Sequence, residues 1–94
     1  MRSYDLYKMI PIIDAEHLKN LIQHYGITDI TFTENNFEFD QSKLPTEEFL
    51  DESMDEYYNR LTFLEICAEL SSVVKNSEQI LLRVVNGKPE ISAI

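Results

Sequence analysis

The side chains best placed to do chemistry are the acids of residues 47–56, which read EEFLDESMDE. Six of these ten residues are acidic, with no lysine or arginine among them, and the acids recur at a spacing of four. In a helix, like charges at this spacing repel, each pair by about 0.2–0.5 kcal/mol. Along the axis this gives one charge per about 2.5 Å, approaching the value of about 1.7 Å for duplex DNA. The pattern favours a functional acidic surface, and the alternative is a helix face that only keeps the protein in solution.

The whole net charge of the chain lies around this stretch. Residues 29–56 hold ten acids and one base, Lys43, which accounts for the total of −9, whereas residues 1–28 and 57–94 are each balanced. Such a surface favours a basic partner and argues against direct binding of nucleic acid or anionic membranes. The predicted partner-binding residues are Glu47, Glu48, Asp51, Glu52, Asp55 and Glu56, with Glu38 and Asp40 as flankers.

Paired carboxylates also suggest a metal site. An EF-hand loop needs a central glycine, and the acidic stretch has none. Glu48 and Asp51 match the first half of the Glu-x-x-Glu and Glu-x-x-Asp signature of the all-α nucleotide pyrophosphatases, but the second half is missing because Glu65 and Glu69 lie four apart. We therefore expect no metal and no cofactor, and metal-dependent nucleotide hydrolysis stays as the alternative function.

Other residue types with catalytic potential have simpler interpretations. His17 and His24 are seven residues apart on one helical face, without a third ligand or a nucleophile in a supporting motif. Cys67 lies in an apolar stripe, which favours packing in the core over nucleophilic catalysis. We expect no catalytic residues and no enzymatic activity.

Length and composition favour one small domain covering residues 1–94. The apolar runs are too short to cross a bilayer, and no leader-like segment opens the chain. A single cysteine suits a reducing compartment, so we expect the protein in the cytoplasm, which would be the host's if a phage encodes it.

The first predicted helix covers residues 14–25. Asp14 resembles an N-cap, Ile13 and Leu18 have the spacing of a hydrophobic staple, and Gly26 provides a stop. Residues 4–10 before it are compatible with a short helix or a strand, because Pro11 would end either one.

The rest of the chain predicts a hairpin, a long helix and a second hairpin. Alternation over residues 30–40 indicates a β-hairpin turning at 34–36, and Asn86-Gly87 favours a type I′ turn between strands in 80–85 and 89–94. Between them, Pro45 suits the first turn of a helix that extends to about Lys75. The fold class expected is α+β, with helix, β-hairpin, long helix and β-hairpin in a two-layer arrangement.

The long helix carries two apolar stripes, which are Leu50, Met54, Tyr57, Leu61, Leu64 and Ala68, and then Phe63, Cys67, Leu70 and Val74. This is more apolar face than one layer of hairpins covers. We therefore expect a symmetric homodimer with contacts at Tyr57, Leu61 and Leu64, and a monomeric core is the alternative.

In length, acidity and charge clustering the chain resembles the phage-encoded acidic DNA-mimic inhibitors of the anti-restriction type. Bacterial immunity proteins that cap basic toxin nucleases share these three properties. The resemblance implies that acids stand in for phosphates within the basic nucleic-acid-binding groove of a nuclease or another DNA-handling protein. A plain assembly module of a larger complex is a further alternative.

Overall fold

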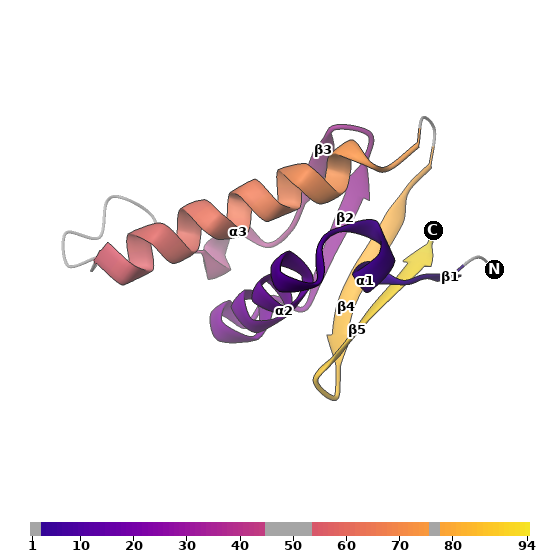
Figure 1. Ribbon diagram of the computed structural model, residues 1–94. Helices are drawn as coiled ribbons and strands as arrows, with labels where there is room; N and C mark the ends of the chain where they lie inside the picture. The colour runs from indigo at the N-terminus through magenta and orange to yellow at the C-terminus, as the bar shows by residue number, and fades with distance from the viewer. Residues whose placement is uncertain (1–2, 45–53, 76–77) are drawn as a thin grey trace.

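The computed structural model describes residues 3–44, 54–75 and 78–94 of the chain (Figure 1). In chain order the elements are β1 (Ser3–Tyr4), α1 (Leu6–Met9), α2 (Ile12–Tyr25), β2 (Asp29–Thr33), β3 (Asn36–Glu38), the 3-10 helix η1 (Gln41–Lys43), α3 (Met54–Ser72), β4 (Ile80–Val85) and β5 (Lys88–Ala93). Helices and an antiparallel sheet form one α+β structure, which confirms the predicted fold class.

Both predicted hairpins are confirmed, and they join in one sheet of order β1-β5-β4-β2-β3. Alternation along β2 and β4 buries Ile30, Phe32, Ile80 and Leu82, each no more than 1% exposed, on one face. Thr31 and Leu81, which lie between these buried residues, point to the opposite face. The turn of the second hairpin has positive φ at both Asn86 and Gly87, 52° and 77°, as a type I′ turn requires.

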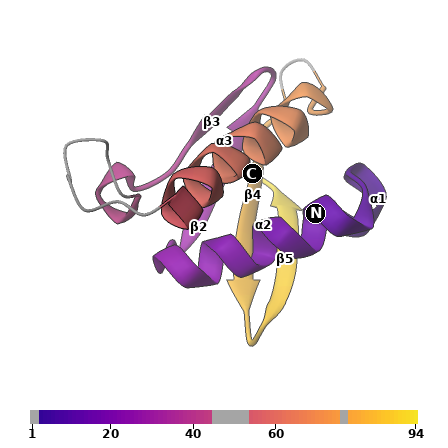
Figure 2. The same cartoon turned by 60° about the vertical axis from the view of Figure 1, so that its left-hand side comes forward.

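Helices α2 and α3 lie side by side on the buried face of the sheet (Figures 1 and 2). They run antiparallel, because the last turn of α2 meets the first turn of α3 through His24 and Glu56. Each helix presents a row of buried apolar side chains to the strands. The result is the predicted two-layer arrangement.

Helix α2 begins two residues earlier than its sequence pattern indicates. The helix covers Ile12–Tyr25 with Pro11 as N-cap residue, and the N–H of Ala15 donates to the Pro11 carbonyl at 2.9 Å. The predicted cap at Asp14 is wrong, because the chain enters the helical conformation directly after the proline. The predicted staple is also wrong, since Ile13 is 81% exposed while Leu18 is buried. The predicted stop is confirmed by the left-handed conformation of Gly26, with φ of 71°.

The segment left open between helix and strand contains one of each. Tyr4 pairs with Ile91 and extends the sheet as β1. The Asp5 side chain then accepts a hydrogen bond from the Tyr7 N–H at 3.0 Å and starts the single turn of α1. Leu6 and Ile10, which are 2% and 5% exposed, anchor this turn in the core.

In α3 the second predicted stripe faces the core. Phe63, Cys67, Leu70 and Val74 are all buried, whereas Met54 of the first stripe is 64% exposed. The helix ends at Ser72, earlier than predicted. Its predicted start and Leu50 lie outside the described residues.

A chain of aromatic rings fastens α3 to both its neighbours. Phe63 makes edge contacts with Tyr25 of α2 at 5.7 Å and with Phe39, after β3, at 5.2 Å. From Phe39 the contacts continue to Phe37 and to Phe32 of β2, at 6.2 Å each. Among these contacting aromatic rings, Phe63 is the only one in α3 within the described residues, and it is fully buried.

Replacing Phe63 with alanine should lower the free energy of unfolding by about 3–5 kcal/mol, because it removes a buried ring and leaves a cavity between the layers. Urea denaturation followed by circular dichroism measures this change. Tyr58→Ala is the matched control, since Tyr58 is an aromatic residue of the same helix that is 57% exposed. Its effect should stay within about 0.5 kcal/mol. Equal losses in the two variants would contradict the central role of Phe63.

Candidate partner-binding surface

Of the six acids predicted to bind a partner in residues 47–56, the structure describes two, and both lie in the first turn of α3. Asp55 is exposed and Glu56 is half-buried. The other four predicted contacts, Glu47, Glu48, Asp51 and Glu52, lie outside the described residues. The acidic stretch therefore leads directly into the N-terminal end of the longest described helix.

Glu56 has a specific contact in addition to its charge. Its Oε1 lies 3.2 Å from Nε2 of His24, in the last turn of α2. The two side chains are 36% and 52% exposed, so the pair remains in contact with solvent. Because His24 carries a charge only when protonated, the contact is a hydrogen bond at neutral imidazole and an ion pair at imidazolium. It ties α2 to the acidic end of α3.

The predicted flanker Asp40 lies at the same end of the molecule. Asp40 Oδ1 accepts hydrogen bonds from the backbone N–H and from Oγ of Ser42, at 3.1 and 2.7 Å, and so caps η1. These bonds, side chain first, lower the pKa of Asp40 below its ordinary value. The views agree that η1 lies beside the N-terminal end of α3 (Figures 1 and 2), and Leu44 after it is buried in the core.

The other flanker, Glu38, points to the opposite face of the sheet. It pairs with Thr31, while its neighbour Phe37 pairs with the buried Phe32 and packs against the core. Side chains alternate along a strand, so Glu38 lies on the face that α3 does not cover. Glu38 therefore lies on the opposite side of the sheet from Asp55 and Glu56 of α3.

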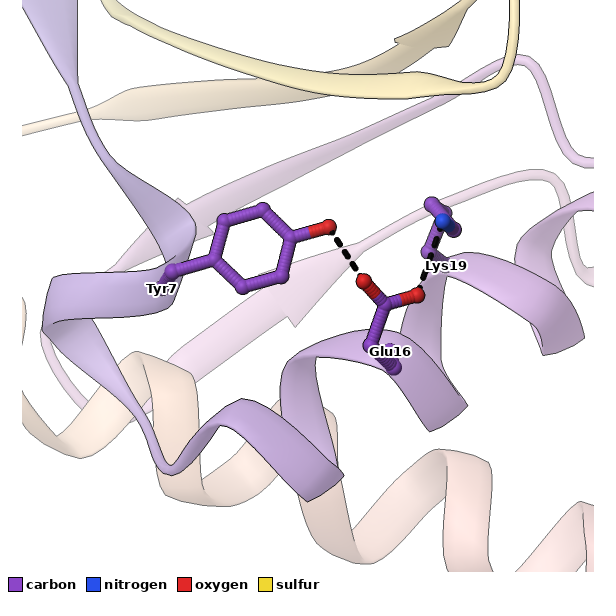
Figure 3. Close-up of polar contacts among 3 residues, drawn as sticks. All are labelled: Tyr7, Glu16 and Lys19. Carbon is purple, nitrogen blue, oxygen red and sulfur yellow. Dashed lines mark hydrogen bonds and ion pairs between the residues drawn. The ribbon is translucent and has the colours of Figure 1, made fainter.

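A polar network that the sequence pattern missed joins α1 to α2. The Tyr7 hydroxyl donates to Glu16 Oε1 at 2.8 Å, and Lys19 Nζ lies 2.7 Å from Glu16 Oε2 (Figure 3). The hydrogen bond to Lys19, with that to Tyr7, lowers the pKa of Glu16, and the bonds to Glu16 raise the pKa values of Tyr7 and Lys19. The spacing of Glu16 and Lys19 was a usable signal, but the position of Tyr7 depends on the turn after β1. The ion pair with Lys19 balances the charge of Glu16, so Glu16 does not add to the excess negative charge of residues 29–56.

A second carboxyl group has an unusual setting where the same two helices meet. Glu69 of α3 lies close to Asp14 of α2, so two carboxyl groups face each other. Desolvation, then hydrogen bonding between the two groups when one is protonated and repulsion when both are ionised, raise the pKa of Glu69. The folded state therefore binds the Glu69 proton more tightly than the unfolded state does.

Cys67 and the histidines have the surroundings of structural residues. Cys67 is fully buried, and burial raises the pKa of its thiol to about 12, so the thiol stays protonated and packs in the core as predicted. His17 is exposed on α2, and His24 contacts Glu56. In residues 3–44, 54–75 and 78–94, no three side chains of the His, Cys, Asp or Glu types converge as metal ligands.

The predicted dimer contacts form a partly covered face of α3. Tyr57 is 38% exposed, with Arg60 stacked over its ring at 5.4 Å. Leu61 and Leu64 are half-buried, and Leu64 packs against the core. The face is less open than the stripe in the sequence indicates, and Tyr57 offers most of its accessible apolar surface.

Replacing Glu69 with glutamine should raise the melting temperature near pH 7 by about 1–4 °C, as expected for a screened, solvent-exposed pair of like charges. The gain should shrink as the pH falls to about 4.5, because protonation relieves the same repulsion in the unsubstituted protein. Glu16 and Asp40, whose pKa values are lowered, would lose their stabilising charge only below that range. Differential scanning calorimetry across this range measures the effect. Glu65→Gln, an exposed glutamate of the same helix, is the control and should show no such pH dependence.

Self-association through this face of α3 should be visible by sedimentation velocity at micromolar concentration. Tyr57→Asp should shift the protein towards monomer, because a carboxylate would be buried in the contact. Val85→Asp adds the same charge at an exposed position of the second hairpin and should leave association unchanged. A protein that is monomeric before substitution would contradict the dimer.

None of the helices in the part of the chain that the structure describes is both long and apolar enough to cross a membrane. In comparisons with known proteins, no family model matches the chain, and neither does any curated protein or solved structure.

Proposed function

We propose that this chain is a small binding protein that occupies the basic nucleic-acid-binding surface of a nuclease or another DNA-handling protein. Its carboxylates take the place of phosphates, and the protein inhibits its partner by blocking the groove. It acts without catalysis or a cofactor, in the cytoplasm where such partners work. The proposal includes restriction, repair and toxin nucleases as partner classes.

The observation that carries the proposal is the gathering of the charge. Ten acids and one base lie in residues 29–56, and the remaining residues of the chain are balanced. Within the described part of this region, six acids (Asp29, Glu34, Glu38, Asp40, Asp55 and Glu56) accompany Lys43. Glu34 lies at the other end of α3 from Asp55 and Glu56, because its neighbour Asn35 donates to the Ser71 carbonyl at 3.2 Å. Acids that are neighbours along the chain, such as Asp55 and Glu56, repel each other, so a partner with opposite charge is the simplest reason for their concentration.

The local contacts of the described acids suit this role. Asp55 and Glu38 are exposed, and hydrogen bonds from Ser42 lower the pKa of the exposed Asp40. Glu16, which lies outside the acidic region, is paired with Lys19. The excess negative charge therefore lies in the region proposed to bind. Glu16, outside this region, is paired and joins α1 to α2.

Replacing Asp51, Glu52, Asp55 and Glu56 with their amides should abolish binding to a basic partner, because its lysines and arginines would lose their counter-charges. The same variant should be more stable by about 0.5–2 kcal/mol, since several like-charge neighbours are removed. Pull-down from lysate and release by duplex DNA measure the binding, and urea denaturation measures the stability. Loss of divalent-ion binding in calorimetry would favour the metal-dependent alternative.

A second pair of variants tests whether binding depends on the position of the charges or only on their total number. Asp55→Asn with Glu56→Gln removes two charges from the proposed surface, and Glu65→Gln with Glu90→Gln removes two exposed charges elsewhere. Only the first pair should weaken binding. Equal effects of both pairs, or partner capture that duplex DNA fails to compete, would contradict the proposal.

The affinity should also fall steeply as salt is raised. Attraction between exposed charges weakens when the Debye length shrinks from about 8 Å at physiological salt to about 3 Å at 1 M. Fluorescence anisotropy with the captured partner across this range measures the dependence. An affinity that is flat with salt would remove charge as the basis of binding.

A further inference from the structure

A groove lies at the other end of α3 from the acids. It has a volume of about 330 Å³ and is formed where α1, the residues after α3 and the start of β4 meet. Four of its lining residues are apolar, namely Met9, Val73, Val74 and Ile80, and two are lysines, Lys8 and Lys75. Along the 19 residues of α3, at about 1.5 Å each, the groove is separated from the acidic turn by about 28 Å.

The charge of the groove is opposite to that of the chain. Lys8 and Lys75 are both exposed, whereas the single carboxylate in the lining, Glu78, accepts a hydrogen bond from the Tyr4 hydroxyl at 3.3 Å. Among the lining residues two ammonium groups accompany one carboxylate, in a protein of net charge −9. A ligand that enters this groove is therefore selected for negative charge close to the two lysines.

Apolar surface around the groove is exposed as well. Val73 in its wall is 47% exposed. Ile12 and Ile13, which follow Met9 by three and four residues, are 64% and 81% exposed. The proximity of Asp14 to Glu69 places this start of α2 beside the last turns of α3, although neither isoleucine lines the groove. An exposed apolar wall in a concave site indicates contact with an apolar group of a ligand.

We propose that this groove docks an acidic segment of a partner protein, with an apolar side chain of that segment between Met9 and Val73 and its carboxylates beside Lys8 and Lys75. The mixed lining suits such a segment better than a bare anion, which makes no use of the apolar walls. The docking is independent of the acidic surface, so one chain would join a basic partner to an acidic one.

Binding of designed peptides to the full chain tests the groove directly. The probes are three fluorescent twelve-residue peptides, composed of glutamate and leucine, of glutamate and serine, and of lysine and leucine. Only the glutamate and leucine peptide should bind. In methyl NMR spectra of the unsubstituted protein it should shift Val73, Val74, Met9 and Ile80, which locates the site without any substitution.

The variant Lys8→Glu with Lys75→Glu should weaken this binding by about tenfold or more, because attraction is replaced by repulsion at two positions. The matched control is Lys88→Glu with Lys43→Glu, which reverses two exposed lysines outside the groove. It should change the affinity less than about threefold. Binding to the basic protein of the proposed function should survive the Lys8 and Lys75 changes, so the two proposals fail separately.

Several outcomes would overturn the groove proposal. These are the absence of peptide binding, equal binding of the glutamate and serine peptide, methyl shifts elsewhere on the protein, and equal effects of the two lysine variants. Binding of vesicles of anionic phospholipid in place of the peptide would make the occupant a membrane. Self-association that the Lys8 and Lys75 changes abolish would make it a second copy of this chain.

Discussion

The packing of Phe63 is the interaction on which the rest of the structure depends. Its ring is fully buried and contacts aromatic rings from α2 and from the segment after β3, so one side chain sets how the helix layer lies on the sheet. Arg60 before Phe63, and Ile66, Cys67, Leu70 and Ser71 after it, are also buried along the same side of the helix. Because a close-packed interior permits few alternative arrangements, fixing this ring also fixes which parts of α3 reach beyond the sheet.

That placement gives the helix two ends of different chemistry. At its N-terminal end, Asp55 and Glu56 lie near η1, which Asp40 caps. At its C-terminal end, Val73 and Lys75 line a groove with Lys8 of α1. Helix α2 lies beside both ends, with His24 close to Glu56 at the first and Asp14 close to Glu69 at the second. A single packed helix therefore separates Asp55 and Glu56 from a groove lined by two lysines and apolar side chains.

The predictable features of this fold are those with local causes. Alternation located both hairpins, Asn86-Gly87 defined one turn, and Gly26 ended α2, because each depends on neighbouring residues. The sequence pattern placed the start of α2 at Asp14, whereas the helix begins directly after Pro11. Alternation puts Phe37 and Glu38 on opposite faces of the strand, but which of the two faces α3 covers depends on tertiary packing. The Tyr7–Glu16 hydrogen bond, and the groove that Lys8 and Lys75 both line, join segments whose proximity exists only in the folded chain.

The short outer strands of the sheet have a consequence for behaviour at high concentration. Exposed strand edges are templates for pairing with other chains, and thereby for fibrous aggregation. Here β3 offers only three residues, and β1 covers β5 at Ile91 and Ser92. The remaining length of β5 contains Pro89, which has no N–H to donate, between the charged Lys88 and Glu90. The described edges are thus poor templates for strand addition, so the protein should resist conversion to amyloid at concentrations where a longer, flatter edge would seed it.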